Sequence, residues 1–433
     1  MNKISMYRSI ARLLPVIVAS VVMLLAISAE PASSANARAS LSFDEKSING
    51  VDAYTWASKG STLVYATSDG TLWSVNGPDF ATPTRIINIA LPDEQNIRQI
   101  VWSPDGQNIA VVSPRSNNLW DTIWLVNLRT SELRDLLPPG APFGGPGRRS
   151  LRISYWFPDG RMAFVMHCGT GCVGLHAVQT QGSEGYWDFC DATGDFFWSP
   201  NEKDAVVENR GQTGGGGLGL VSASDGVAVA TGASYYRPRK ECSSVFTVPF
   251  RRGLYFNSWF PDSKTVLYTD AGLNSSQLKL WNTVSGVRTT LVAGGSSGAL
   301  SPDGRYICFI SPEHETATTR LSKRVLLKIL DLQGKRIVAS REIPTVLPAV
   351  QWSPSTSYLA VLTGEDKLLL ASFSPDGIRV RQTDVTAAEL SWSANGKYLA
   401  VRDHFYAPAK ITILKFPFDA APSTGTTPGM PHQ

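Results

Sequence analysis

One short stretch recurs along the chain and limits what the chain can fold into. Its clearest copy is Trp102-Ser103-Pro104-Asp105-Gly106, followed at once by the apolar run 108–112. Ser-Pro-Asp-Gly suits a tight turn, because proline fixes φ, aspartate bonds nearby backbone and glycine tolerates the conformation that returns the chain to a strand. The β-rich runs on both sides of this turn predict a hairpin. Other copies, complete or degenerate, follow the anchor positions Trp56, Trp156, Trp198, Trp259, Leu300, Trp352 and Trp392.

The spacing of these anchors predicts the architecture. From Trp56 to Trp392 the eight anchors span 336 residues in seven intervals, an average of 48, and propeller blades run roughly 40 to 50 residues. A second pair of strands is expected after each hairpin, as in 122–127 and 132–136, which gives four antiparallel strands per repeat. We therefore predict an all-β, eight-bladed propeller, or a seven-bladed one if a weak repeat is not a full blade. Each anchor tryptophan is expected to pack between neighbouring sheets.

Two further features concern the end of the repeat series. Phe373-Ser374-Pro375-Asp376-Gly377 resembles a ninth copy, but it lies about half a blade from the anchors on either side. We interpret it as the turn between the last two strands of blade seven. Blade eight supplies 398–402 and 411–416 and then lacks a fourth strand. Leu41-Ser42-Phe43 could add that strand, so that the N- and C-terminal strands close the ring and leave no exposed sheet edge.

A tryptophan, Ser-Pro-Asp-Gly and then a run of the Ile-Ala-Val-Val type resemble the WD40-like propeller repeat (PD40 repeat) of TolB-type proteins. The resemblance covers nearly all of 44–418. It implies a β-propeller but no particular activity, since such propellers include scaffolds, receptors and enzymes. TolB-type proteins also carry an α/β domain before a six-bladed propeller, and this chain has no room for one before its first blade.

The N-terminal residues are typical of a secretory signal peptide. Lys3, Arg8 and Arg12 form a positive region, 13–29 is apolar, and Ala35-Asn36-Ala37 offers a cleavage site. We predict a signal peptide at 1–37, the propeller at 38–418 and a disordered tail at 419–433. An uncleaved N-terminal membrane anchor is the alternative. The protein is thus expected to be exported, to the periplasm, the cell surface or the medium.

The five cysteines suit an oxidising compartment. Cys168 and Cys172 flank a predicted hairpin tip, and we predict that they pair with each other. Cys190 and Cys242 are predicted to form a second disulfide. Cys308 lies in a β run and is expected to be a buried free thiol.

Three patterns that could indicate catalysis or ligand binding are rejected. Gly294–Gly298 matches G-x-S-x-G, but that motif needs a following helix and the next turn follows instead. Gly214–Gly219 is glycine-rich, yet no Gly-Lys-Ser/Thr follows it. The last pattern matches no strong zinc spacing, so neither a metal nor a cofactor is predicted. It comprises His167, Cys168, Cys172 and His176.

The remaining candidates lie in two places. Polar residues near the innermost strands at the channel mouth are mixed in sign and include no histidine: Asp52, Arg98, Arg152, Asp195, Asn257, Gln351 and Glu389. A long excursion of blade four, Ser234 to Arg252, offers residue types that are enriched at interfaces. They are Tyr235, Tyr236, Arg237, Arg239 and Arg251.

From these features we expect a non-catalytic binding or scaffold protein that recognises a protein, peptide or glycan. The alternative is a hydrolase or lyase with its active site at the channel mouth. The formal net charge of +4 is too small to indicate nucleic acid as a partner.

Overall fold

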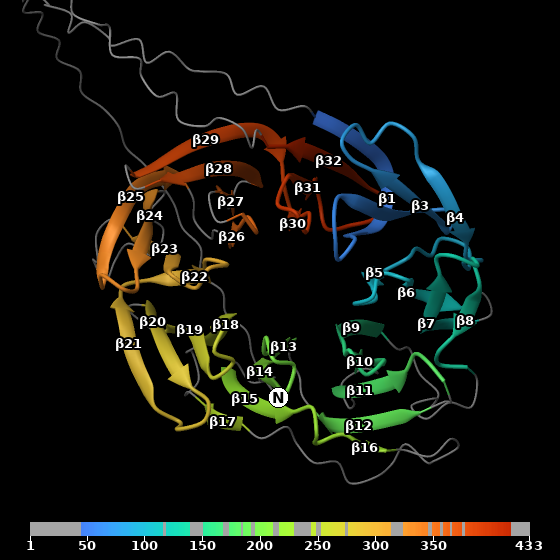
Figure 1. Ribbon diagram of the computed structural model, residues 1–433, viewed down its shortest axis with the longest axis horizontal. Coiled ribbons are helices and arrows are strands. Elements are labelled where there is room, and N and C mark those ends of the chain that lie inside the picture. Colours follow the sequence, from blue (N-terminus) through green and yellow to red (C-terminus); the bar gives the residue numbers. More distant parts are fainter. Residues whose placement is uncertain are drawn as a thin grey trace, which may run out of the picture. The chain divides into compact units, whose positions relative to one another are not determined.

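A computed structural model describes the fold between residues 45 and 416. Every regular element in the part it describes is a β-strand, as the sequence predicted, and the described strands belong to one compact unit. The described strands make seven antiparallel sheets, which follow one another in chain order (Figure 1). The description leaves out 1–44, 116–117, 139–149, 168–172, 183–184, 192–194, 211–215, 229–243, 248–252, 273–275, 313–323, 345–348, 356–357, 364–365, 375–376 and 417–433.

Five sheets have the four antiparallel strands that the repeat predicts. The first two are β5 (Gln99–Trp102), β6 (Asn108–Arg115), β7 (Asn118–Asn127) and β8 (Leu133–Asp135), and then β13 (Asp195–Trp198), β14 (Asp204–Arg210), β15 (Gly216–Ser222) and β17 (Ser244–Thr247). The third is β18 (Gly253–Trp259), β19 (Thr265–Ala271), β20 (Ser276–Asn282) and β21 (Arg288–Ala293). The last two are β22 (Ser296–Leu300), β23 (Tyr306–Pro312), β24 (Arg324–Asp331) and β25 (Arg336–Pro344), and β26 (Ala349–Trp352), β27 (Tyr358–Leu362), β28 (Lys367–Ser374) and β29 (Gly377–Thr386).

One sheet has five strands because it borrows one from its neighbour. Its own strands are β9 (Ser150–Trp156), β10 (Arg161–His167), β11 (Val173–Gln179) and β12 (Tyr186–Asp191). After β15 the chain does not continue in its own sheet but pairs with the edge strand β12 as β16 (Val227–Ala228). It then returns to pair with β15 as β17. This exchange links two neighbouring sheets and was not predicted.

The largest sheet joins the two ends of the described chain. Its order is β30 (Glu389–Trp392), β31 (Tyr398–Arg402), β32 (Ala409–Lys415), β1 (Glu45–Trp56), β2 (Thr62–Thr67), β3 (Thr71–Asn76) and β4 (Thr84–Asn88). The first half of β1 pairs with β32, and its second half pairs with β2. The register shifts around Gly50, whose φ of 71° suits glycine. The strand beside β32 is therefore Glu45–Ile48, whereas 41–43, which we predicted there, lie outside the described residues.

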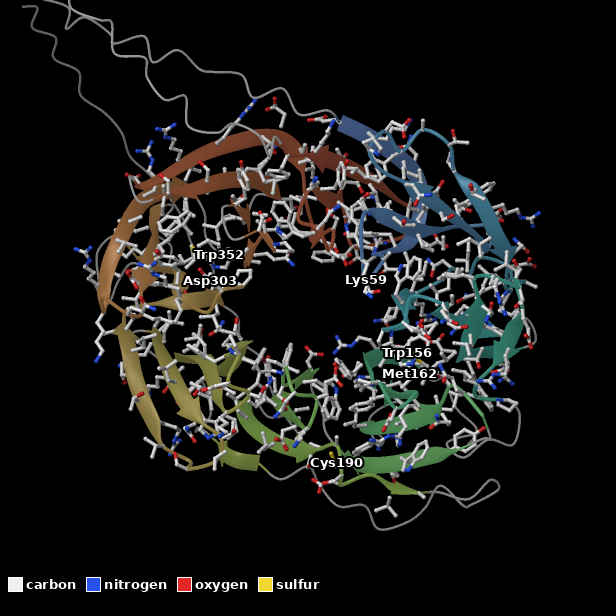
Figure 2. The ribbon with its side chains drawn as sticks, viewed as in Figure 1. Lys59, Trp156, Met162, Cys190, Asp303 and Trp352 are labelled. Atoms are coloured by element: carbon white, nitrogen blue, oxygen red, sulfur yellow. The ribbon has the colours of Figure 1, made fainter. Side chains whose placement is uncertain are left out.

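The anchor positions behave as the repeat predicts. Each of the eight ends the first strand of a four-strand series, and buried side chains from neighbouring sheets pack around the tryptophans. Trp156, for example, belongs to a cluster with Met162 of its own sheet and Ile123 of β7; Trp156 and Met162 lie together in Figure 2. First strands of neighbouring sheets contact one another, as β1 does β5 and β22 does β26.

Three anchor tryptophans also donate a hydrogen bond to the first strand of another four-strand series. The indole N–H of Trp352 donates to the carbonyl oxygen of Ala299, 3.0 Å away, on β22. Trp56 and Trp259 do the same to Ser391 of β30 and Phe197 of β13, at 2.9 and 2.8 Å. Each acceptor directly precedes the anchor position of its own strand, so these first strands are held in a repeated register.

The two misleading motifs are resolved as predicted. Ser374 pairs with Gly377, so that copy of the turn joins β28 to β29 within one sheet. Ser296–Leu300 forms β22, so the second half of the G-x-S-x-G match lies within a strand, and the turn after Leu300 follows it in place of a helix. Among the described residues no helix is long and apolar enough to cross a membrane, and the apolar run 13–29 lies outside them.

Candidate functional site

The candidate residues gather at one end of the sheets. Because neighbouring strands alternate in direction, the loops between second and third strands lie at the same end as the connections to the next sheet. We call this end the connection face. The first strands begin there, and the predicted channel-mouth residues Arg98, Asp195 and Glu389 lie at or just before those beginnings.

Asp52 of β1 is almost fully buried, with 2% of its surface exposed. Its Oδ1 accepts a hydrogen bond from the Ser68 hydroxyl at 3.0 Å. Its Oδ2 accepts one from the backbone N–H of Ile97, at 3.3 Å, in the connection to the next sheet. Burial raises the pKa of Asp52, although both hydrogen bonds oppose that shift. This carboxyl group therefore ties two neighbouring sheets together.

Two other buried acids make the same type of contact. Asp121 of β7 accepts a hydrogen bond from the N–H of Leu151, on the next sheet, at 3.0 Å. Glu208 of β14 accepts one from the N–H of Phe256, also on the next sheet, at 2.9 Å. Sequence reasoning missed both acids, and the available signal was a carboxylate that directly follows apolar residues within a strand. Three acids thus fasten successive sheets in the same way.

The remaining charged channel-mouth residues form separate ion pairs. Arg98 lies 3.0 Å from Asp121, measured from Nε to Oδ1, and Arg152 pairs with Asp195. Glu389 lies 3.6 Å from Nη1 of Arg402. The five predicted residues are thus divided among four groups, with Asp52 bonded to Ser68 and Ile97 and the others in the ion pairs Arg98–Asp121, Arg152–Asp195 and Glu389–Arg402. Of the two polar residues named beside them, Asn257 accepts a hydrogen bond from Thr269 at 2.7 Å, and Gln351 lies exposed on β26.

A histidine lies beside one of these pairs, which the sequence did not predict. His167 ends β10, and its pKa is lowered, first by burial and then by the charge of Arg152. The charge of Asp195 opposes that shift. An imidazole, a carboxylate and a guanidinium from three strands are therefore close enough to influence one another.

An open cavity of about 420 Å³ lies on the connection face where the β31–β32 loop meets the first sheet. Its wall carries several carboxylates and a few apolar side chains. The lining residues are Asp52, Ser68, Asp69, Leu91, Pro92, Asp93, Glu94, Gln95, Asn96, Ala407 and Pro408. Asp52 is the only one of them that the sequence had singled out, since the others come from loops without a motif.

The predicted binding insertion cannot be assigned a place. Tyr235, Tyr236, Arg237, Arg239 and Arg251 lie outside the described residues. The flanking strands are described: β16 pairs with β12, and β17 pairs with β15.

The cysteines are described only in part. Cys308 is a buried free thiol, as predicted, and burial raises its pKa. Cys190 on β12 is buried and takes part in a disulfide bond. Cys168, Cys172 and Cys242 lie outside the described residues, so both predicted pairings stay predictions. Among the residues that are described, no group of three or more potential ligands could hold a metal ion.

Comparison with known proteins identifies the fold and no more. No family model matches the chain, and no curated protein matches it. The solved structure of the Dos1 propeller is similar, with a TM-score of 0.52 and 10% identity over 86% of this chain and 94% of that one. An oligogalacturonate lyase in complex with manganese has a TM-score of 0.47 and 12% identity, over 87% of this chain and 91% of that one. The likeness to the Dos1 propeller shows that the chain has a β-propeller fold.

Proposed function

We propose that this protein is an exported, non-catalytic binding platform that recognises a protein, peptide or glycan on one face of its propeller. The observation that carries the proposal is the use of the buried acids. Asp121 and Glu208 each accept a hydrogen bond from a backbone N–H of the next sheet, and Asp52 accepts one from the connection that leads to the next sheet. Carboxylates held in this way stabilise the scaffold and are poorly placed to transfer a proton to or from a substrate. The function needs no cofactor.

The proposal includes a closed ring of eight blades. Eight first strands carry the anchor positions, and the two halves of β1 would belong to the last and the first blade. The pairing of β1 with β32 supports this count. Closure through both ends of the chain would give a rigid surface on which loops can be presented.

Export is the second part of the proposal. A leader at 1–37 would direct the chain out of the cytoplasm, and cleavage after Ala37 would leave a mature protein that begins at Arg38. If the leader is not removed, it would instead anchor the propeller to a membrane. Disulfides between Cys168 and Cys172 and between Cys190 and Cys242 fit an oxidising compartment.

The alternative function, a hydrolase or lyase, has one specific observation in its favour. His167 has a lowered pKa and lies beside the Arg152–Asp195 pair. A neutral imidazole close to a carboxylate can act as a general base. This alternative places catalysis at the blade that contains β9 and β10.

The test is affinity capture from the native cell envelope and the culture medium with tagged residues 38–433. A platform retains one component saturably and leaves it chemically unchanged, which mass spectrometry would reveal. A variant with Tyr235, Tyr236 and Arg237 replaced by alanine shows whether the insertion contributes. If the captured component is instead converted to a product, and His167→Ala abolishes that conversion, the protein is an enzyme and the proposal is wrong.

A further inference from the structure

Two aromatic side chains project from the connection face next to the acidic cavity. Phe405 and Tyr406 lie in the loop between β31 and β32, and 70% and 82% of their surfaces are exposed. The loop is fixed at its base, because Oδ1 of Asp403 accepts a hydrogen bond from the backbone N–H of Lys410 at 3.0 Å. Large aromatic side chains stabilise a protein when they are buried, so two neighbouring exposed ones indicate a contact surface.

The same loop forms part of the cavity wall. Ala407 and Pro408, which directly follow the two aromatic residues, line the cavity of about 420 Å³. A partner that covers Phe405 and Tyr406 would therefore also reach this cavity. The aromatic pair and the cavity form one continuous surface, which we call the acidic-aromatic surface.

The cavity is negatively charged. Asp52, Asp69, Asp93 and Glu94 line it, and none of its lining residues is a lysine, arginine or histidine. Hydrogen bonds from Thr67 and Thr71 lower the pKa of Asp69, which keeps its carboxylate ionised at neutral pH. Asp93 and Glu94 are exposed at the mouth of the cavity. A cationic group is therefore the complementary ligand.

The residues that line the cavity favour a basic side chain over a metal ion as its ligand. No set of three or more ligands suited to a metal ion occurs in the described part of the chain. The wall also includes Leu91, Pro92 and Pro408. Lysine and arginine have an apolar stem and a charged head, so the stem can lie along these side chains while the head reaches the carboxylates. Arginine can in addition stack on an exposed aromatic ring.

We propose that the acidic-aromatic surface docks a lysine- or arginine-bearing segment of a partner protein. The long basic side chain enters the cavity, and the neighbouring residues of the segment cover Phe405 and Tyr406. This inference rests on the proposed binding function and names the surface and the chemistry of the partner. Charge complementarity commits it to a basic protein segment, because anionic nucleic acid or membrane would be repelled by the cavity.

The test measures binding of a defined probe to residues 38–433 by fluorescence anisotropy. The probe is a fluorescein-labelled peptide with alternating Lys, Arg and Gly residues, and its neutral counterpart carries Gln in place of each Lys and Arg. We expect the basic peptide to bind at least tenfold more tightly than the neutral one, with an affinity that falls as salt is added.

Matched variants assign this binding to the surface. Asp93→Asn/Glu94→Gln should weaken binding of the basic peptide about tenfold, and Phe405→Ala/Tyr406→Ala should weaken it severalfold. Glu132→Gln, at an exposed acid of the β7–β8 turn, and Val284→Ala, at a valine that is 75% exposed, should leave it unchanged. All four variants alter exposed side chains, and equal thermal unfolding midpoints would confirm that they remain folded.

Two results would overturn the inference: equal binding of the basic and neutral peptides, or equal weakening by the surface variants and their controls. A separate capture experiment distinguishes this failure from failure of the proposed function. If Phe405→Ala/Tyr406→Ala still retains the component that the wild type captures, the platform stands and this docking surface does not. If the wild type captures nothing, the platform itself is wrong.

Discussion

In most copies the repeated turn begins with a buried serine: Ser103, Ser199, Ser301, Ser353 and Ser393. Ser103 donates to Oδ1 of Asp105, and its oxygen also accepts a hydrogen bond from the N–H of Asn108, at 2.9 Å. In a degenerate copy the serine donates to an asparagine, as Ser393 does to Asn395 at 2.8 Å. Each of these serines is followed two residues later by an oxygen acceptor, which Asp, Asn and Ser all supply. The copies without serine begin with Ala57, Phe157 or Phe260, so the hydroxyl group supports the turn where it occurs but is not required for it.

The tryptophan hydrogen bonds allow a prediction at the same scale. Trp352→Phe removes the indole donor to the carbonyl of Ala299. Trp392 is equally buried, but its indole N–H has no hydrogen-bond partner among the described residues. We expect Trp352→Phe to lower the free energy of unfolding by about 1 kcal/mol more than Trp392→Phe does. Urea unfolding of both variants measures the difference, and equal losses would show that the hydrogen bond adds nothing to packing.

Two aspartates should respond to pH in opposite directions. Burial raises the pKa of Asp52, so the folded protein holds this proton more tightly than the unfolded chain, and the resulting stability is lost as the pH rises through the folded-state pKa. The hydroxyl of Ser103 and the N–H of Gln107 lower the pKa of Asp105. The stability that Asp105 contributes is therefore present above its unfolded pKa and is lost in acid.

The measurement compares each variant with the wild type by urea unfolding between pH 3 and pH 7. Relative to the wild type, Asp52→Asn should gain stability as the pH rises, and Asp105→Asn should lose it. If the difference in unfolding free energy from the wild type changed in the same direction with pH for both variants, the electrostatic roles assigned to these two carboxyl groups would be wrong.

At the scale of the element, β1 is unusual because its two halves pair with different strands, β32 and β2. Ser47 lies directly opposite Thr412, and only the shift around Gly50 turns the strand toward β2. A Ser47→Cys/Thr412→Cys variant should therefore form a cross-strand disulfide, since opposite Cβ atoms lie within bridging range. This disulfide would close the loop from residue 47 to residue 412, and closing so long a loop should stabilise the fold by about 4 kcal/mol. Peptide mapping detects the bridge, and the thermal midpoint reports its effect.

The matched control moves the cysteine by one residue. Lys46→Cys/Thr412→Cys places the two side chains on opposite faces of the sheet, because side chains alternate along a strand. It should form no bridge. Cross-linking of both pairs, or of neither, would contradict the pairing of β1 with β32.

The elements also show where prediction from the sequence succeeded and where it failed. The turn motif located the first two strands of each sheet, because its proline, acceptor and glycine act locally. No motif marks the strand 45–48, which pairs with β32, since a strand that only fills a sheet edge needs none. The exchange of β16 onto β12 depends on contacts between residues far apart in the chain. Asp121 and Glu208 were missed for the same reason, because their partners are backbone groups of another sheet.

In the molecule as a whole, some charged side chains stabilise the scaffold and others are available to a partner. The formal net charge is only +4, and yet acids gather in one cavity on the connection face. Charges between sheets, such as the Arg152–Asp195 pair, hold the scaffold together. Charges at the cavity mouth, such as Asp93 and Glu94, are exposed and can meet a partner. The binding function is therefore expected to reside in the loops and not in the repeated strands.

Site-specific photo-cross-linking in the native cell envelope tests this claim most directly. A photoreactive phenylalanine derivative replaces Tyr406 in one variant and Val284 in the other; Val284 is equally exposed but lies in the β20–β21 turn, at the opposite end of its sheet. We expect the residue at position 406 to cross-link a partner protein next to a lysine or arginine, and the residue at position 284 not to cross-link it. Cross-linking of that partner from position 284 but not from position 406 would contradict this claim.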